Sequence, residues 1–337
     1  MIVSQTTNRN WVKGINSLRF ILALIVLLSH FENPLVIEFK SSSAFFVKSI
    51  GSIIGVFFNG VAAVIAFFII SGFVIHQSSK DLKLTWRTFI LKRYLRILLP
   101  LLVIILLGYK FNHPEKDILW SLICELIYYT VYPVLRKLNT NWATLSKFSF
   151  ALSILIITIF AWHDVLAIIT QESLNFQGHY WQIGVSLTWV IGLPCWILGI
   201  LISENFKSLM FMSTKKIMTY RLLVFVISVV LNFMHFHLHL GYIVSMNFFA
   251  LILYKWIQAE ISYFKTHPPS HILENLGNFS YSIYIIHPLC YAVLMQKLSM
   301  SFFNYLIVIS ITLLLSYIFY LTIERPSHLI ARKLHIG

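Results

Sequence analysis

Long apolar stretches recur along the whole chain, and they constrain its fold more than any other feature of the sequence. A helix of about 20 apolar residues can cross a bilayer, because it satisfies its own backbone hydrogen bonds in lipid. The pattern therefore predicts a bundle of about ten transmembrane helices. We place them at residues 14–30, 51–76, 88–108, 118–135, 148–163, 183–203, 219–235, 239–258, 277–296 and 302–322.

The composition agrees with a membrane environment and excludes a soluble globular domain. Hydrophobic residues make up 58% of the 337 positions, charged residues only 11%, and the mean hydropathy is +0.79. We expect an all-α integral membrane protein with a single domain over residues 1–337, a core at about 15–326 and no appended soluble domain. The first stretch is interpreted as a span and not as a signal peptide, because it lacks an Ala-x-Ala-like cleavage site and contains Arg19 and His30.

The distribution of Lys and Arg predicts the orientation of the bundle, since cytoplasmic loops carry an excess of these residues. With both termini in the cytosol, 20 of the 26 Lys and Arg residues fall on cytoplasmic segments, and only five fall on outer loops. We therefore expect cytosolic termini. The net charge of +14 then reflects topology and contact with anionic lipid, so nucleic acid is not an expected partner.

The cysteines and histidines give little sign of a disulfide or a metal site. The three cysteines each lie within a predicted span, which suggests small buried hydrophobes. Three histidines alternate at positions 235, 237 and 239, but no Cys, Asp or Glu is close to them in the sequence. We expect neither a bound metal nor a permanently bound cofactor.

The first predicted span carries two ionisable residues, which are costly in lipid unless they face the bundle interior or water. Arg19 and His30 are 11 positions apart and so share one helical face, with a separation of about 16 Å. One interpretation is a polar channel along this helix, and the alternative for His30 is an interfacial position. Histidine is suited to take a proton near neutral pH, so His30 is a candidate general base.

A basic cluster stands at the cytosolic start of the third predicted span. Arg93 and Arg96 are at positions i and i+3 on one helical face, with Lys92 and Arg87 nearby. One interpretation is a positive anchor at the membrane surface. The other is a clamp for the phosphates of a nucleotide-bearing donor, because paired guanidiniums bind phosphate in bidentate geometry. The sequence leaves both interpretations open.

The fourth predicted span carries a stripe of polar side chains. Glu125, Tyr128, Tyr129 and Tyr132 fall at positions i, i+3, i+4 and i+7, which places them on one helical face. Such a stripe lines a polar space within the bundle. Glu125 either forms a structural bridge with one of the arginines or takes part in chemistry.

Two further segments complete the set of polar features. Along residues 280–287, Ser280, Tyr284 and His287 share one helical face, and Tyr281 lies beside it. An interfacial aromatic belt accounts for the tyrosines but not for the deeper histidine. In the second span, Ser71 precedes a glycine at mid-helix, where small residues favour close packing of helices.

Taken in chain order, these segments closely resemble the acyltransferase 3 family, the integral-membrane O-acetylases of bacterial O-antigens, capsules and related glycans. One departure is Asn16, where many members carry an Asp that can bridge to the nearby arginine. The resemblance extends from about residue 15 to residue 326. It rests on the motifs Arg19-x10-His30, Phe68-x-x-Ser71-Gly72-Phe73, Arg93-x-x-Arg96, Trp120-Ser121-Leu122-x-x-Glu125-x-x-Tyr128-Tyr129, Ser280-Tyr281-Ser282-x-Tyr284-x-x-His287 and Glu324-Arg325-Pro326.

The resemblance implies a ten-helix bundle of the inner, cytoplasmic membrane with a defined chemistry. Such a bundle takes acetyl-CoA or another acyl-CoA as its donor and delivers the acyl group to a hydroxyl of an envelope glycan or lipid-linked sugar. In this interpretation Arg93, Arg96 and Lys92 bind the donor, and His30, Arg19 and Glu125 are catalytic. The supporting tunnel residues are Ser71, Tyr128, Tyr129, Tyr281, Tyr284 and His287.

Two other classes of function fit parts of the sequence. A transporter or flippase of an envelope precursor would also place polar residues along several spans, although no inverted repeat is found. A scaffold in an envelope-assembly complex would need no buried arginine and histidine pair. The acceptor side is sparsely defined: an outer segment suited to a sugar, or to an ordinary polar loop, contains His163, Asp164, Glu172, Gln177, His179, Tyr180 and Trp181.

Overall fold

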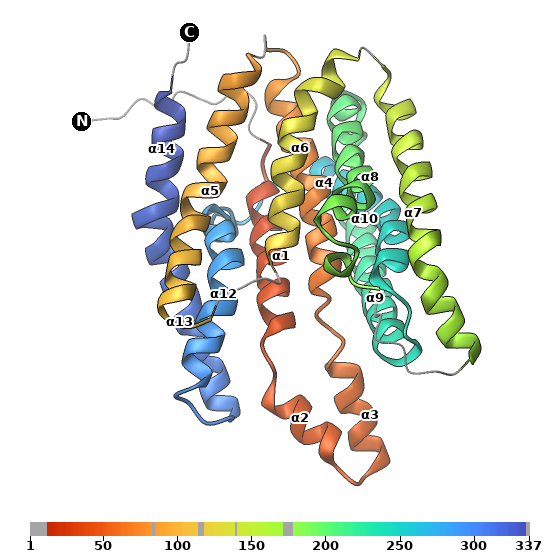
Figure 1. Cartoon of the computed structure of the whole chain (residues 1–337), viewed down its shortest axis with the longest axis vertical. Coiled ribbons are helices and arrows are strands. Elements are labelled where there is room, and N and C mark those ends of the chain that lie inside the picture. Colours follow the sequence, from red (N-terminus) through yellow and green to blue (C-terminus); the bar gives the residue numbers. More distant parts are fainter. Residues whose placement is uncertain (1–11, 83–84, 114–117, 139, 171–177, 335–337) are drawn as a thin grey trace.

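The computed structural model is a bundle of helices that run mostly along its long axis (Figure 1). It describes residues 12–82, 85–113, 118–138, 140–170 and 178–334, and over these ranges it contains helices and no strand, which confirms the all-α prediction. The long helices are α1 (Ile15–His30), α4 (Gly60–Ser79), α5 (Trp86–Lys110), α6 (Leu119–Lys137), α7 (Trp142–Thr170), α8 (Val185–Glu204), α9 (Thr214–Leu238), α10 (Tyr242–Phe264), α12 (Ser280–Met295) and α13 (Phe302–Phe319). The short helices are α2 (Pro34–Ser41), α3 (Phe45–Ile54), α11 (His271–Leu276) and α14 (Arg325–Lys333).

Each predicted span overlaps one of the long helices, but the second span is divided. The first residues of the predicted segment 51–76 belong to α3, and α4 begins only at Gly60. Asn59 explains this start, because its side chain caps α4 by accepting a hydrogen bond from the backbone N–H of Ala62 at 3.0 Å. Helices α2 and α3 lie beyond this break, at one end of the bundle (Figure 1).

Five of the described helices are long and apolar enough to cross a membrane, namely α4, α7, α8, α9 and α13 with its continuation. Helix α1 and the following α2, bent by 44°, make a sixth if the pair counts as one span. The predicted count of ten crossings is therefore not established. Helices α1 and α12 have only 16 residues each, while α5 and α6 carry Arg93, Arg96 and Glu125 within their apolar sequence.

Helices α4 and α8 form the centre of the bundle. Of their apolar spans 67% is buried, against 12% for α7 and 17% for α9, which lie at the periphery. A Cβ on Gly72 would lie 2.0 Å from the carbonyl oxygen of Trp196, and one on Gly199 would lie 1.9 Å from that of Ile69. The close packing predicted beside Ser71 is thus confirmed, and it fixes the wall of the bundle that carries this serine.

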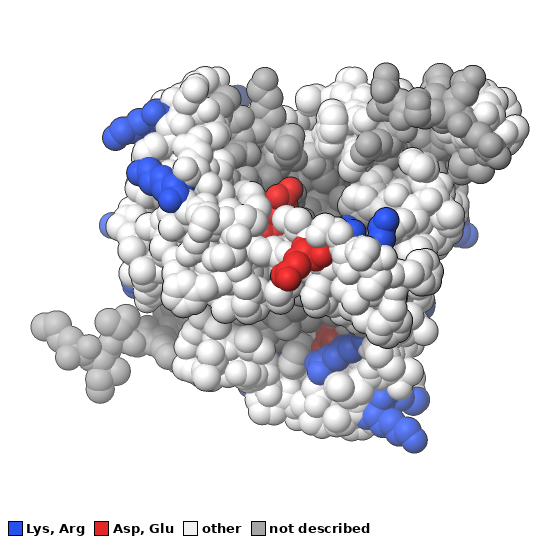
Figure 2. Space-filling view, turned by 90° about the horizontal axis from the view of Figure 1, so that it is seen from below, with Lys and Arg blue, Asp and Glu red and all other residues white. Residues whose placement is uncertain are grey.

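The chain passes from α13 into α14 through a π-helical turn at Tyr320–Glu324. Helix α14 packs against α5 and runs antiparallel to it, so the end of α14 and the start of α5 lie at the same end of the bundle (Figure 1). The opposite end carries α2 and α3. Figure 2 looks onto that end and shows a mostly uncharged surface with acidic side chains near its middle and scattered Lys and Arg side chains.

Candidate active site

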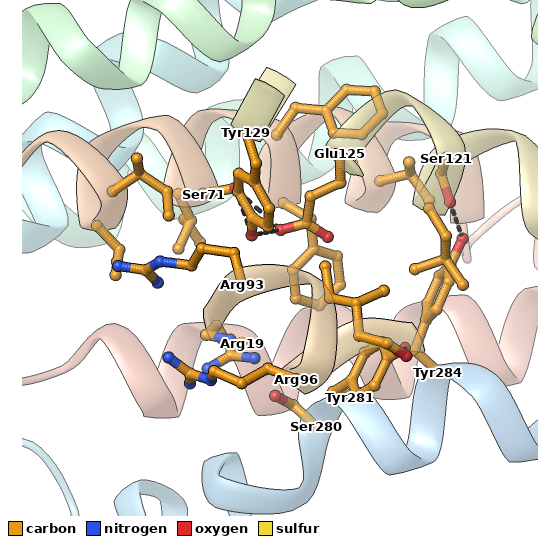
Figure 3. Close-up of a pocket in the computed structure, with 18 of the residues that line it drawn as sticks. Arg19, Ser71, Arg93, Arg96, Ser121, Glu125, Tyr129, Ser280, Tyr281 and Tyr284 are labelled. Atoms are coloured by element: carbon orange, nitrogen blue, oxygen red, sulfur yellow. Dashed lines mark hydrogen bonds between the residues drawn. The ribbon is translucent and has the colours of Figure 1, made fainter. Parts of the chain in front are cut away.

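A polar cavity lies inside the bundle between α1, α4, α5, α6 and α12 (Figure 3). Its volume is about 160 Å³, enough for roughly ten water molecules. The helices α1, α5, α6 and α12, which fall short of an uninterrupted apolar span, supply most of its polar side chains. Such side chains are tolerated at membrane depth where they face protein or water. The polar lining consists of Arg19, Ser71, Arg93, Arg96, Ser121, Glu125, Tyr129, Ser280, Tyr281, Tyr284, Glu324 and His328.

Three guanidinium groups gather at one end of the cavity (Figure 3). Arg19 comes from α1, and Arg93 and Arg96 come from successive turns of α5, whereas the neighbouring Lys92 does not line the cavity. Arg93 donates a hydrogen bond to the hydroxyl of Ser78 at 3.3 Å. Among the described residues, the ion pairs within 4.0 Å are His76–Glu204, Arg221–Glu260 and Glu324–His328. This end of the cavity therefore carries positive charge that no direct ion pair balances.

Glu125 of α6 faces the same cavity and is held by hydroxyl groups. Its Oε1 accepts a hydrogen bond from the Ser71 hydroxyl at 2.9 Å and another from the Tyr129 hydroxyl. The indole N–H of Trp196 donates to the Ser71 hydroxyl at 3.3 Å, which orients it from α8. Over the described ranges Glu125 makes no ion pair within 4.0 Å, so the arginine bridge that the sequence left open is not formed.

Tyr284 of α12 lies at the end of the cavity opposite the arginines (Figure 3). Its hydroxyl lies 2.6 Å from that of Ser121, and this hydrogen bond joins α12 to α6. One turn earlier, the Tyr281 hydroxyl donates to the carbonyl of Ile97 at 2.9 Å and fixes α12 against α5. Tyr128, which was predicted to support the tunnel, is instead buried away from the cavity, where its hydroxyl donates to the carbonyl of Trp189 at 3.0 Å.

Ser280 lines the cavity although it was not among the predicted site residues. It is 1% exposed, and its hydroxyl has no hydrogen-bond partner in the described part of the chain. Buried hydroxyls are nearly always hydrogen-bonded, so one that faces a cavity without a protein partner is available to water or to a ligand. Figure 3 draws it on the side that holds Arg19 and Arg96. The helical face that it shares with Tyr284 and His287 is the sequence signal that could have identified it.

Glu324 is a second lining residue that the sequence interpretation did not assign to the site. Glu324 is the last residue of the π-helical turn. Its Oε2 accepts hydrogen bonds from the backbone N–H and the hydroxyl of Ser282, at 3.1 and 2.5 Å. Its Oε1 lies 3.8 Å from Nε2 of His328, which also lines the cavity. The Glu324-Arg325-Pro326 motif was the available signal. This carboxyl group accepts hydrogen bonds from the first turn of α12 and so positions the helix that carries Tyr281 and Tyr284.

His30 and His287 form a pair beyond Tyr284, outside the cavity lining. The rings of Tyr284 and His287 are 6.1 Å apart between centroids, and those of His287 and His30 are 5.0 Å apart. His30 is exposed at the end of α1, whereas His287 is fully buried on α12. Arg19 and His30 belong to one helix as predicted, but the cavity reaches only Arg19. The Tyr284 ring stands between the cavity and the histidine pair.

The outer segment suggested as an acceptor site is described only in part. Glu172 and Gln177, and the side chains of His163 and Asp164, lie outside the described residues. Trp181 is 53% exposed, and its ring stacks on that of His179 with a centroid distance of 5.9 Å. Tyr180 is buried, and its hydroxyl accepts a hydrogen bond from the side chain of Asn247 at 2.9 Å. Trp181 is thus the exposed aromatic face of this segment.

Comparison with known proteins identifies the family. The model of an acyltransferase domain, that of the acyltransferase 3 family, matches residues 12–115 and 117–321. The matched residues include α1, α4, α5, α6 and α12 and both histidines of the pair, whereas the lining residues Glu324 and His328 follow the match. No curated protein and no solved structure matches the chain. The family match covers nearly the whole bundle, and the chain therefore belongs to the acyltransferase 3 family of membrane acyltransferases.

Proposed function

We propose that the protein transfers an acyl group, most simply acetyl, from cytosolic acyl-CoA to a hydroxyl of a cell-envelope glycan or lipid-linked sugar, such as O-antigen or capsular polysaccharide. Membership of the acyltransferase 3 family supports acyl transfer. The observation that carries the choice of donor is the electropositive end of the cavity. Arg19, Arg93 and Arg96 face this space without an ion-pair partner within 4.0 Å in the described ranges.

An acyl-CoA donor matches this arrangement chemically. Its phosphate groups supply the negative charge that three neighbouring guanidiniums need, and guanidiniums bind phosphate oxygens through paired hydrogen bonds. In this proposal the acyl end of the donor enters the cavity, and its nucleotide stays outside the arginine end. The Ser280 hydroxyl then donates its hydrogen bond to an oxygen of the bound donor.

His30 acts as the general base in the transfer step. It takes the proton of the acceptor hydroxyl while that oxygen attacks the thioester carbon and forms the new ester bond. The carbon–sulfur bond breaks, and the proton held by His30 passes to the departing thiolate, which leaves as CoA. Because the Tyr284 ring lies between the cavity and the histidine pair, the thioester meets His30 only after Tyr284 moves from its hydrogen bond with Ser121.

The polarity of the bundle suggests how the two substrates arrive. In this proposal the end that carries the start of α5 and the end of α14 faces the cytosol, in the inner membrane, and receives acyl-CoA. The acceptor approaches from the opposite end, where His30 is exposed. The exposed ring of Trp181 offers a stacking surface for a sugar.

The proposal is tested with the purified protein in lipid nanodiscs. Wild-type protein should release CoA from acetyl-CoA when an envelope glycan is supplied, and the ester should appear on the glycan. The His30→Ala variant should bind the donor and release CoA only at a small residual rate. Consumption of no acetyl-CoA, together with movement of a glycan precursor across liposome membranes, would establish a transporter instead. Deletion of the gene without loss of O-acetyl groups from any envelope glycan would redirect the search to small acceptors.

A further inference from the structure

His287 is a buried histidine whose described hydrogen-bonding neighbours are backbone groups of its own helix, Ile283 and Tyr284, and another histidine. It is 0% exposed on α12, and its Nε2 lies 3.2 Å from Nδ1 of His30. Its own Nδ1 lies 3.2 Å from the carbonyl oxygen of Ile283. His30 is exposed and is the candidate base, and the buried ring of His287 lies directly behind it.

The carbonyl groups around the pair decide where the protons are. A carbonyl oxygen only accepts hydrogen bonds, so the His287 nitrogen that faces Ile283 carries the proton, and its Nε2 carries a lone pair. The carbonyl oxygen of Val26 lies 2.9 Å from Nδ1 of His30, so this nitrogen also carries a proton. The two assignments agree, because the Nδ1–H of His30 then points between an oxygen and the lone pair of His287.

The opposite assignment creates two repulsive contacts. If Nε2 of His287 donated to His30, the lone pair of the neutral His287 ring would face the Ile283 carbonyl, and the lone pair on His30 Nδ1 would face the Val26 carbonyl. Only the first arrangement satisfies all three contacts with neutral rings. It leaves Nε2 of His30 as the nitrogen without a proton, which is the atom that a general base needs.

We propose that His287 is a positioning residue that holds His30 in its Nδ1-protonated form. It accepts a hydrogen bond from Nδ1–H, fixes the plane of the His30 ring, and stabilises the charged ring that forms when Nε2 takes the acceptor proton. This is the part played by a group behind a catalytic histidine in many hydrolytic sites, here provided by a neutral imidazole. The inference rests on the proposed role of His30 as the base.

The test compares three substitutions at position 287 in the full-length protein in nanodiscs. In His287→Gln the side-chain oxygen can occupy the place of Nε2, so we expect at least a third of the wild-type kcat. In His287→Asn the oxygen reaches only the place of Nδ1, and in His287→Leu no acceptor is present. Both should lower kcat by at least tenfold, with the KM for acetyl-CoA unchanged within twofold, because the donor site lies beyond Tyr284.

A double variant separates positioning from a purely structural role. If His287 acts through His30, adding His287→Asn to His30→Ala should lower the residual rate no further. Equal kcat in His287→Gln, His287→Asn and the wild type would overturn the inference, as would a fall in donor affinity equal to the fall in kcat. The proposed function fails separately, through full activity of His30→Ala or absence of acetyl-CoA turnover in the wild type. Because Gln and Asn are both polar, their difference decides the question even if His287→Leu does not fold.

Discussion

The hydroxyl of Ser71 lies 2.9 Å from Oε1 of Glu125, and this contact joins the tightly packed centre of the bundle to its cavity. Ser71 belongs to α4, one of the two central helices, and its hydroxyl accepts a hydrogen bond from the Trp196 indole of α8. Glu125 belongs to α6 and also accepts from Tyr129. The carboxylate is therefore fixed by neutral donors, and in the described ranges the three arginines have no carboxylate partner within 4.0 Å. A negatively charged donor can then bind without first displacing a protein carboxylate.

The first prediction concerns the charge of Glu125. In Glu125→Gln the amide oxygen can still accept from Ser71, but the two hydrogen bonds lose their ionic character, which contributes about 1 kcal/mol or more to each. We expect a loss of about tenfold in kcat/KM and a lower unfolding midpoint, because the same hydrogen bonds hold α6 against α4. The release of CoA and the unfolding midpoint of the purified variants measure the two effects. Tyr129→Phe, which keeps the charge and the serine contact, should lose less activity, and the reverse order would contradict this role.

Much of the candidate site could be predicted from the sequence because placing its ionisable residues in lipid costs free energy. Arg19, Arg93, Arg96 and Glu125 stand out against apolar neighbours, and helical spacing places them on inward faces. All four line one cavity in the structure. Helical periodicity likewise located the long helices, since a helix in a bilayer must pair its own backbone groups.

Other parts of the site depend on packing between distant segments, which periodicity does not encode. The position of Ser280 on α12 suggested a polar face, but only the three-dimensional structure shows that its hydroxyl lacks a partner. Glu324 enters the site because a π-helical turn changes its direction. Tyr128, expected to support the tunnel, does not line this cavity, because the polar stripe covers more of the helix surface than one cavity does and Tyr128 faces α8.

The second prediction concerns the arginines and uses a truncated donor. Arg93→Ala and Arg96→Ala should raise the KM for acetyl-CoA by about tenfold to a hundredfold, because each removes a charge-assisted hydrogen bond to phosphate. The KM for acetyl-pantetheine, which lacks the phosphates, should be unchanged in both variants. Lys92→Ala is the matched comparison, since Lys92 is adjacent in sequence but does not line the cavity, and it should raise the KM for acetyl-CoA less than either arginine variant. Equal effects on both donors would show that the arginines act structurally.

The third prediction compares two serines on one helix. In Ser280→Ala the protein loses a buried hydroxyl that has no partner in the described structure, so thermal stability should stay the same or rise. Donor affinity should fall, because the hydroxyl is then missing from the bound complex. Ser282→Ala should behave oppositely, since its hydroxyl donates to Glu324 at 2.5 Å, and its loss should destabilise the protein by about 1–3 kcal/mol. Thermal unfolding with and without acetyl-CoA measures both quantities, and a destabilised Ser280→Ala would show that this hydroxyl has a structural partner.

The fourth prediction concerns the crossing of α4 and α8. A methyl group at Gly72 would lie 2.0 Å from the carbonyl oxygen of Trp196, and one at Gly199 would lie 1.9 Å from that of Ile69, so each substitution must push two helix backbones apart. Gly72→Ala and Gly199→Ala should each cost about 1–3 kcal/mol of stability. Gly55→Ala is the control, because the nearest obstacles there are the side-chain ends of Lys40 and Val36, at 3.0 Å.

The same two variants also test whether the crossing positions the cavity. Separation of α4 from α8 moves the Ser71 hydroxyl away from the Trp196 indole, so activity should fall together with stability. The double variant should cost less than the sum of the single ones, because the first substitution already opens the space that the second needs. Unfolding midpoints in detergent and CoA release in nanodiscs measure the two properties. If Gly72→Ala had the unfolding midpoint of the wild type, the two helices would separate there at no cost in stability. The α4–α8 crossing would then not be what holds Ser71 against Glu125.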